Sequence, residues 1–231
     1  MLSVDGSLGY PGSVVLPEVK WEVGPGEFVL LVGSNGSGKT TLLRSCAGLL
    51  KPRGGTVSVR GRRASDAASK RHIGYLPDPP PLYEELTGQE HCELVERLWA
   101  GDVTAERVDE LVEAMRLQPF FHQRCDALSS GTRKRLGVAL ALMHSPDLLL
   151  LDEPHNGLDA RSAQALTTLI TQVVGGGGCC VVSTHQPQRL LDLATRVTVL
   201  YESRIVYDQS PTGWDPYEWG FTDLPDDGDD D

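Results

Sequence analysis

A glycine-rich segment near the start of the chain has the residue types and spacing of a phosphate-binding loop. Residues 33–40 read Gly-Ser-Asn-Gly-Ser-Gly-Lys-Thr, which satisfies G-x-x-x-x-G-K-[ST] in full. Glycines let backbone N–H groups turn inward around phosphate oxygens, and the N-terminus of a following helix adds a positive dipole end. Lys39 would place its charge at the β- and γ-phosphates, and the Thr40 hydroxyl would ligate Mg²⁺. We therefore expect a nucleoside triphosphate site formed by Ser34, Asn35, Gly36, Ser37, Gly38, Lys39, Thr40 and Thr41.

Two adjacent carboxylates, Asp152 and Glu153, follow the apolar run 148–151. Because open α/β sheets bind ligands at the carboxyl ends of their strands, Asp152 is expected beside the phosphates. Asp152 could hold Mg²⁺ through water, and Glu153 could polarise the attacking water as a general base. The alternative is an ordinary strand that ends in a solvated acidic turn, which is disfavoured behind a phosphate loop.

The elements that must position these residues can be read from the hydrophobic pattern. Buried strands are expected at residues 27–32, 148–152 and 179–183, with helices at 40–50 and 159–174 between them. Strand, helix and strand in that order indicate a parallel sheet with helices on its faces. A short hairpin is expected at residues 197–200 and 204–207. The predicted fold class is therefore α/β with a mainly parallel sheet.

Residues 80–145 have a different, helical pattern. Apolar residues three and four positions apart predict helices at 88–100, 104–117 and 129–144, with no strand-like run between them. The prediction is a helical subdomain inserted into the α/β core.

Charge and composition exclude several classes of protein. The net charge is −11, but residues 205–231 hold nine acidic residues and no Lys or Arg, which leaves −2 for residues 1–204. Neither part has the basic stripe expected of a nucleic-acid binder, so no nucleic-acid partner is predicted. The apolar runs are far too short to cross a bilayer, and no secretion signal is visible. The five cysteines lack C-x-x-C spacing, which favours a reduced, cytoplasmic setting.

Three further segments appear in a fixed order with these motifs. Residues 128–135 read Leu-Ser-Ser-Gly-Thr-Arg-Lys-Arg, residues 156–159 read Asn-Gly-Leu-Asp, and residues 183–185 read Ser-Thr-His. With them the chain resembles the ATP-binding subunits of ABC transporters over residues 1–207. The resemblance implies that Ser129 and Gly131 of one subunit close on the γ-phosphate held by another subunit. It also implies that Asp159 contacts the nucleotide and that His185 senses the γ-phosphate.

Each of these assignments has a simpler alternative. Ser129 could be a helix N-cap and nothing more. Tyr10 lies 29 residues before Lys39, where the family places an aromatic ring against adenine, but it could also be a core tyrosine.

The resemblance implies a phosphate-loop core with an antiparallel N-terminal β region. Core residues 1–79 and 146–207 would flank a helical subdomain at 80–145, and residues 208–231 would form an aromatic and acidic tail with a disordered end. ATP and Mg²⁺ are the implied cofactors, held in part by Asp152 and Thr40, with Lys39, Glu153 and His185 catalytic. The implied partners are membrane permease subunits and a second copy or a paralogous ATPase subunit. The chain would be cytoplasmic and would touch the membrane only through the permease.

Some positions depart from the family pattern. Asp78 stands where the family usually has Gln, at the junction of core and helical subdomain, and could still reach Mg²⁺ or its waters. Ser130 and Thr132 also differ from the usual LSGGQ signature. Residues 76–88 resemble the junction of an efflux and haem-exporter subgroup, which favours export.

The permease is expected to dock around Leu82, Tyr83 and Glu85, although Leu82 and Tyr83 could instead pack the subdomain. The aromatic segment 214–221 is expected to pack on its own domain or on a neighbouring subunit. Two other functions stay open, namely a soluble ABC-type ATPase that acts on ribosomes or DNA, and a different phosphate-loop enzyme such as a small-molecule kinase.

Overall fold

A six-stranded sheet forms the centre of the molecule. The computed structural model describes residues 1–99 and 101–220. In the sheet order β10-β9-β3-β8-β7-β6, all neighbours run parallel except β10, which is antiparallel to β9. The strands are β3 (Phe28–Val32), β6 (Ile73–Leu76), β7 (Leu148–Asp152), β8 (Cys179–Thr184), β9 (Arg196–Tyr201) and β10 (Arg204–Gln209). The α/β class and the mainly parallel sheet are confirmed.

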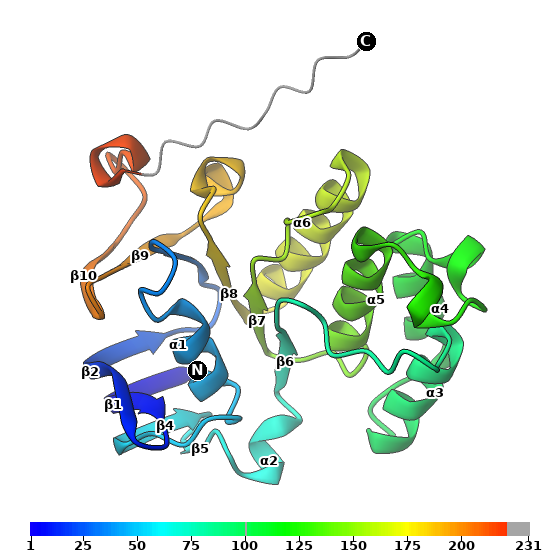
Figure 1. Cartoon of the computed structure of the whole chain (residues 1–231), viewed down its shortest axis with the longest axis horizontal. Helices are drawn as coiled ribbons and strands as arrows, with labels where there is room; N and C mark the ends of the chain where they lie inside the picture. Colours follow the sequence, from blue (N-terminus) through cyan, green and yellow to red (C-terminus); the bar gives the residue numbers. More distant parts are fainter. Residues whose placement is uncertain (100, 221–231) are drawn as a thin grey trace.

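A second, antiparallel sheet lies against one face of the first (Figure 1). Its order is β2-β1-β4-β5, with β1 (Leu2–Tyr10), β2 (Ser13–Val23), β4 (Gly54–Val59) and β5 (Arg62–Arg63). Helix α1 (Lys39–Cys46) contacts strands of both sheets, and a short helix α2 (Ala67–Lys70) precedes β6. The antiparallel N-terminal region expected from the family resemblance is therefore present.

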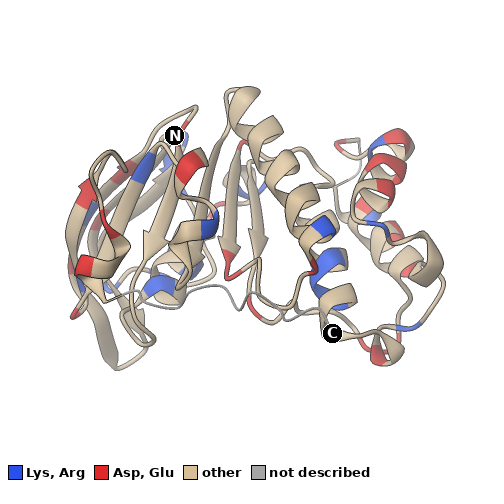
Figure 2. Cartoon of the chain, turned by 90° about the horizontal axis from the view of Figure 1, so that it is seen from above, with Lys and Arg blue, Asp and Glu red and all other residues tan. Residues whose placement is uncertain are grey.

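Helices between β6 and β7 form the right-hand part of the molecule in Figure 1. They are α3 (Gly88–Leu98), α4 (Ala105–Ala114) and α5 (Ser130–Leu142), with short 3-10 turns η1 (Gln118–Phe120) and η2 (Cys125–Ala127). Each α-helix begins at a polar N-cap, because the hydroxyls of Thr87, Thr104 and Ser129 each accept a bond from a backbone N–H three residues later. Figure 2 shows acidic residues grouped at this end, where α3 and α4 lie.

The alternation of side chains along the central strands divides the core in two. Val29, Leu31 and Leu150 point toward α1 and the antiparallel sheet. Leu30 and Leu151, their neighbours in sequence, point to the opposite face, where α5 and α6 (Ala160–Gly175) cover the sheet. Because both faces are buried, these strands are continuously apolar. They hold the loops at their carboxyl ends on a rigid base.

The C-terminal part adds short 3-10 turns around β9 and β10. These are η3 (Pro187–Arg189), η4 (Leu191–Leu193) and η5 (Pro216–Trp219). Trp214 is 6% exposed and packs in the core on the α5–α6 face. The expected disorder at the acidic end, and the Phe221 end of the aromatic segment, lie outside the described residues.

Two expectations about elements need correction. The helix expected at 40–50 ends at Cys46, because Gly48 has φ +65° and a Cβ there would lie 2.1 Å from the carbonyl oxygen of Ala64. The helix expected at 88–100 ends at Leu98. In the described part of the chain, no helix is both long and apolar enough to cross a membrane.

Candidate nucleotide-binding site

The phosphate-binding loop connects β3 to α1 at the carboxyl edge of the central sheet. Gly36 and Gly38 have φ values of +82° and +108°, which residues with a side chain rarely adopt. At Gly33 a Cβ would lie 2.5 Å from the carbonyl oxygen of Leu200, so the close packing of loop and sheet requires glycine there. The three glycines thus allow the turn that directs backbone N–H groups toward an anion.

Lys39 directs its charge back into this loop. Its Nζ donates hydrogen bonds to the carbonyl oxygens of Gly33 at 2.7 Å and Ser34 at 3.1 Å. Burial lowers the pKa of Lys39, while the nearby charges of Glu153 and Asp152 act in the opposite direction. The ammonium group therefore lies in the loop where phosphates are expected to bind.

Two of the three candidate Mg²⁺ ligands, Thr40 and Asp152, meet directly. The Thr40 hydroxyl donates to Oδ2 of Asp152 at 2.7 Å, although the two residues are 112 positions apart. Ser183 donates a very short hydrogen bond to the other oxygen of Asp152. Within the described residues, no group of three or more His, Cys, Asp and Glu could hold a metal ion. A hydroxyl and one carboxylate fit a Mg²⁺ ion that keeps waters and takes further ligands from phosphates.

Glu153 and His185 are also brought together. Nδ1 of His185 lies 3.0 Å from Oε2 of Glu153, whose side chain is 15% exposed. Both residues line a pocket of about 490 Å³ beside the phosphate loop. A smaller pocket of about 190 Å³ next to it is lined by Val15, Asn35, Gly36, Gly38, Lys39, Thr40, Thr41, Asp152 and Glu153. The two pockets share Asn35 and Glu153, so the carboxylate lies between the phosphate loop and the open space.

Asp78 lines the larger pocket, as expected, but its carboxylate already has a partner. Oδ1 of Asp78 lies 2.8 Å from Nζ of Lys134 in α5. Nothing in the sequence indicated Lys134 as a partner, because it is 56 residues away. The role of Asp78 as a metal ligand stays a prediction.

Five predicted nucleotide contacts do not line these pockets, namely Tyr10, Ser37, Ser129, Gly131 and Asp159. Ser129 caps α5 by accepting a bond from the N–H of Thr132 at 3.2 Å, and Asp159 caps α6 by accepting from Ser162 at 2.7 Å. The Tyr10 hydroxyl accepts a bond from Arg44 at 3.3 Å. Like Gly131, none of these residues lines either pocket. Neither pocket of the single chain gathers these residues with the phosphate loop.

Several residues that the sequence analysis gave no role at the nucleotide belong to the site, although Asn156 and Ser183 stand in segments that it quoted. Asn156, Tyr201 and Trp219 line the larger pocket. Ser183 joins Asp152 to the backbone of Glu153, whose N–H donates to the Ser183 hydroxyl at 3.1 Å. The position of Ser183 in the same segment as His185 is the one sequence signal that could have found it. Trp219 belongs to the aromatic segment 214–221, which was expected to pack on its own domain or on a neighbouring subunit, but nothing in the sequence placed it beside the nucleotide.

Comparison with known proteins identifies the family of this chain. The family model described as ABC transporter matches residues 16–156. The ABC transporter ATP-binding protein YdbJ of Bacillus subtilis (strain 168) is 35% identical over 204 residues, covering 87% of this chain and 66% of YdbJ. The chain therefore spans less than two thirds of YdbJ.

Two more similarities cover larger shares of the matched proteins. The SkfA peptide export ATP-binding protein SkfE of the same organism is 34% identical over 186 residues, covering 79% of this chain and 77% of SkfE. The dimeric structure of MJ0796, a bacterial ABC transporter cassette, has a TM-score of 0.82 and 25% identity, covering 93% of this chain and 100% of that one.

Proposed function

The chain belongs to the ABC transporter family of ATP-binding proteins, and from this premise we propose that it binds and hydrolyses ATP to power transport through membrane permease subunits. The observation that carries the proposal is the meeting of Lys39, Thr40, Asp152, Glu153 and His185 at one edge of the sheet. A phosphate-binding loop alone would fit many enzymes. The ordered set of carboxylates and histidine beside it fits hydrolysis of the γ-phosphate.

The residues have distinct roles in this proposal. Loop N–H groups and Lys39 bind the phosphates, and the Thr40 hydroxyl and Asp152 would hold Mg²⁺, which would neutralise phosphate charge when bound. Glu153 accepts the proton of the attacking water, and His185 orients the Glu153 carboxylate through the 3.0 Å contact. The pocket on the open side of Glu153 leaves room for that water and for groups from a second subunit.

A second copy or a paralogous subunit completes the site. Ser129, Gly131 and Asp159 do not line the pockets of their own chain, which supports a role at the nucleotide of a partner. At Ser129 the start of α5 would contribute N–H groups to an anion. The structure of MJ0796 is dimeric, which supports pairing of two subunits.

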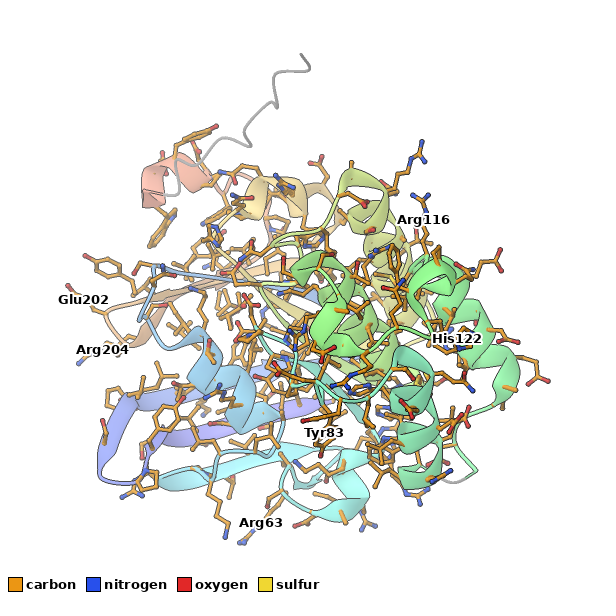
Figure 3. The ribbon with its side chains drawn as sticks, turned by 45° about the vertical axis from the view of Figure 1, so that its right-hand side comes forward. Arg63, Tyr83, Arg116, His122, Glu202 and Arg204 are labelled. Atoms are coloured by element: carbon orange, nitrogen blue, oxygen red, sulfur yellow. The ribbon has the colours of Figure 1, made fainter. Side chains whose placement is uncertain are left out.

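We propose that the permease docks in the apolar groove between the sheet and the helices. This groove of about 280 Å³ is lined by Leu82, Trp99, Leu140 and neighbouring residues. Tyr83, on the loop at this junction in Figure 3, is 60% exposed and stacks on His91. Docking there would place the chain at the cytoplasmic face of the membrane. The similarity to SkfE, a peptide export ATP-binding protein, supports export rather than import. Action on ribosomes or DNA is the less favoured alternative.

The substitution Glu153→Gln tests the hydrolytic role. It removes the general base but keeps the size of the side chain, so ATP should still bind while its turnover falls by about 10²–10⁴-fold. Turnover should be measured in the complex with its membrane partner, and ATP binding on the same sample. Turnover at the level of the unmodified chain would show that Glu153 is not the base.

A further inference from the structure

Three segments that are far apart in the sequence meet at the ammonium group of Lys134. Lys134 lies near the start of α5 and is 4% exposed. Its Nζ donates to Oδ1 of Asp78 at 2.8 Å and to the backbone carbonyl oxygen of Glu153 at 3.0 Å. A buried ammonium group is stable only where such acceptors surround it. The ion pair therefore ties the end of β6 and helix α5 to the loop that carries Glu153.

The backbone of Glu153 needs support, because its φ of +44° lies in the left-handed region. That conformation is unfavourable for a residue with a side chain and persists where the surroundings hold it. On one side, the N–H of Glu153 donates to the Ser183 carbonyl oxygen at 3.2 Å and to its hydroxyl at 3.1 Å. On the other side, its carbonyl accepts from Lys134 and, at 3.4 Å, from the N–H of Asn156.

A second contact joins α5 to the same loop. A Cβ at Gly131 would lie 2.5 Å from the carbonyl oxygen of Gly157, so the backbone of the first turn of α5 packs against this loop without a side chain between them. Residues 153–157 are thus held to α5 at both ends. A displacement of α5 would pull on the backbone that orients the Glu153 carboxylate.

We propose that Lys134, held by Asp78, is a positioning residue that sets the backbone of Glu153 and so makes hydrolysis depend on the placement of α5. The inference rests on the proposed ATP hydrolysis and names a regulation of that site. In the proposed dimer, α5 presents Ser129 to the partner's nucleotide. Helix α5 would then control the general base beside the nucleotide of its own chain. It would also control closure of the site around the partner's nucleotide.

Amide hydrogen exchange of the full chain tests the positioning step without ATP turnover. In Lys134→Met the unbranched apolar side chain is one atom shorter and loses both hydrogen bonds. Exchange of the amides in residues 153–157 should become at least about 5-fold faster, because the loop opens locally. Exchange in β7 should not change. Asp78→Asn/Lys134→Met should give the same exchange as Lys134→Met alone, because the two side chains act as one unit.

Turnover of the complex with its membrane partner tests the catalytic consequence. A displaced base lowers kcat rather than ATP affinity, so Lys134→Met should reduce kcat on the order of 10-fold with KM for ATP within about 2-fold. Lys134→Gln keeps a donor and should recover most of the turnover. If Lys134→Met does not fold, Asp78→Asn removes the charged partner of Lys134 instead, and unchanged exchange at residues 153–157 in that variant would overturn the proposal.

The control is Arg71→Met, which removes another ion pair between the sheet region and the helices. Arg71 contacts Asp102 at 2.7 Å with a 57% exposed side chain and has no bond to residues 153–157. Arg71→Met should change neither the amide exchange of residues 153–157 nor kcat. The proposal is overturned if the amides of residues 153–157 exchange at the same rate in Lys134→Met as in the unmodified chain. It is also overturned if Arg71→Met changes exchange and kcat as Lys134→Met does. Normal turnover in Glu153→Gln would instead contradict the proposed function, and the exchange result would still judge the positioning of the loop.

Discussion

At the scale of single residues, Ser183 supports both carboxylates of the site. It is fully buried, donates to Asp152 and accepts from the N–H of Glu153 at 3.1 Å. In Ser183→Ala, an oxygen of the buried Asp152 carboxylate loses this donor. We expect the free energy of unfolding to fall by about 1–3 kcal/mol, measured by urea denaturation.

Thr168→Ala is the control for this prediction. Thr168 bonds the carbonyl oxygen of Gln164 at 3.1 Å on the exposed side of α6, so removing its hydroxyl should change stability by less than about 0.5 kcal/mol. If the two variants lose the same stability, Ser183 does not support the site as the geometry indicates.

The residues with catalytic chemistry could be predicted from the sequence, whereas those that support them could not. Lys39, Thr40, Asp152, Glu153 and His185 stand in local patterns of a few residues with a chemical meaning. Ser183 and Lys134 act through bonds to residues 31 and 56 positions away. A serine at a strand end and a lysine in a helix are common, so their partners become visible only in three dimensions.

At the scale of elements, Asp159 anchors the start of α6. Its Oδ1 accepts a bond from the N–H of Ser162 at 2.7 Å, and this backbone bond, followed by the Ser162 side chain, lowers the pKa of Asp159. Asp159→Ala should reduce the free energy of unfolding by about 1 kcal/mol at neutral pH. Because the folded-state pKa is lowered, this stabilisation is present above the unfolded pKa of about 3.9 and is lost as pH falls through the folded value.

Urea denaturation at pH 7 and below pH 4 measures this dependence. Thr104→Ala is the matched control, since Thr104 caps α4 with an uncharged hydroxyl that accepts from Arg107 at 3.2 Å. The stability difference between the unmodified chain and Thr104→Ala should not depend on pH. If Asp159→Ala lost as much free energy of unfolding at low pH as at pH 7, the ionised carboxylate of Asp159 would not be what stabilises the start of α6.

Elements with a strong local pattern were predictable, and those defined by long-range pairing were not. Strand β7 was expected at 148–152 and lies there, because an unbroken apolar run next to a turn indicates a buried strand. Strand β6 is only Ile73–Leu76 and contains Gly74, so its local strand pattern is too short and interrupted to be recognised. It forms by pairing with β7, whose residues follow it by 75 positions. The antiparallel sheet was expected only from the family resemblance.

At the scale of the whole molecule, each side of the central sheet supports a different part of the proposed function. Helix α1 and the antiparallel sheet hold the phosphate loop from one face. Helices α5 and α6 cover the other face and present Ser129 and Asp159 as their N-caps. Because both sides pack on the same rigid strands, movement of the helices can be transmitted to residues at the strand ends.

The C-terminal segment joins this architecture through Trp214 and not through Trp219. Trp214 is 6% exposed within the core, whereas Trp219 is 37% exposed, lies against Tyr207 with ring centroids 6.0 Å apart and lines the larger pocket.

Trp214→Ala should therefore lower the free energy of unfolding by about 3–5 kcal/mol, as for other buried aromatic residues. Trp219→Ala should lower it by less than about 1 kcal/mol. Urea denaturation of both variants and of a chain lacking residues 210–231 measures the effect, and the deletion should be at least as destabilising as Trp214→Ala. If both variants and the deletion lowered the free energy of unfolding by the same small amount, the C-terminal segment would only lie on the surface. The fold would then not fix the position of Trp219 at the pocket.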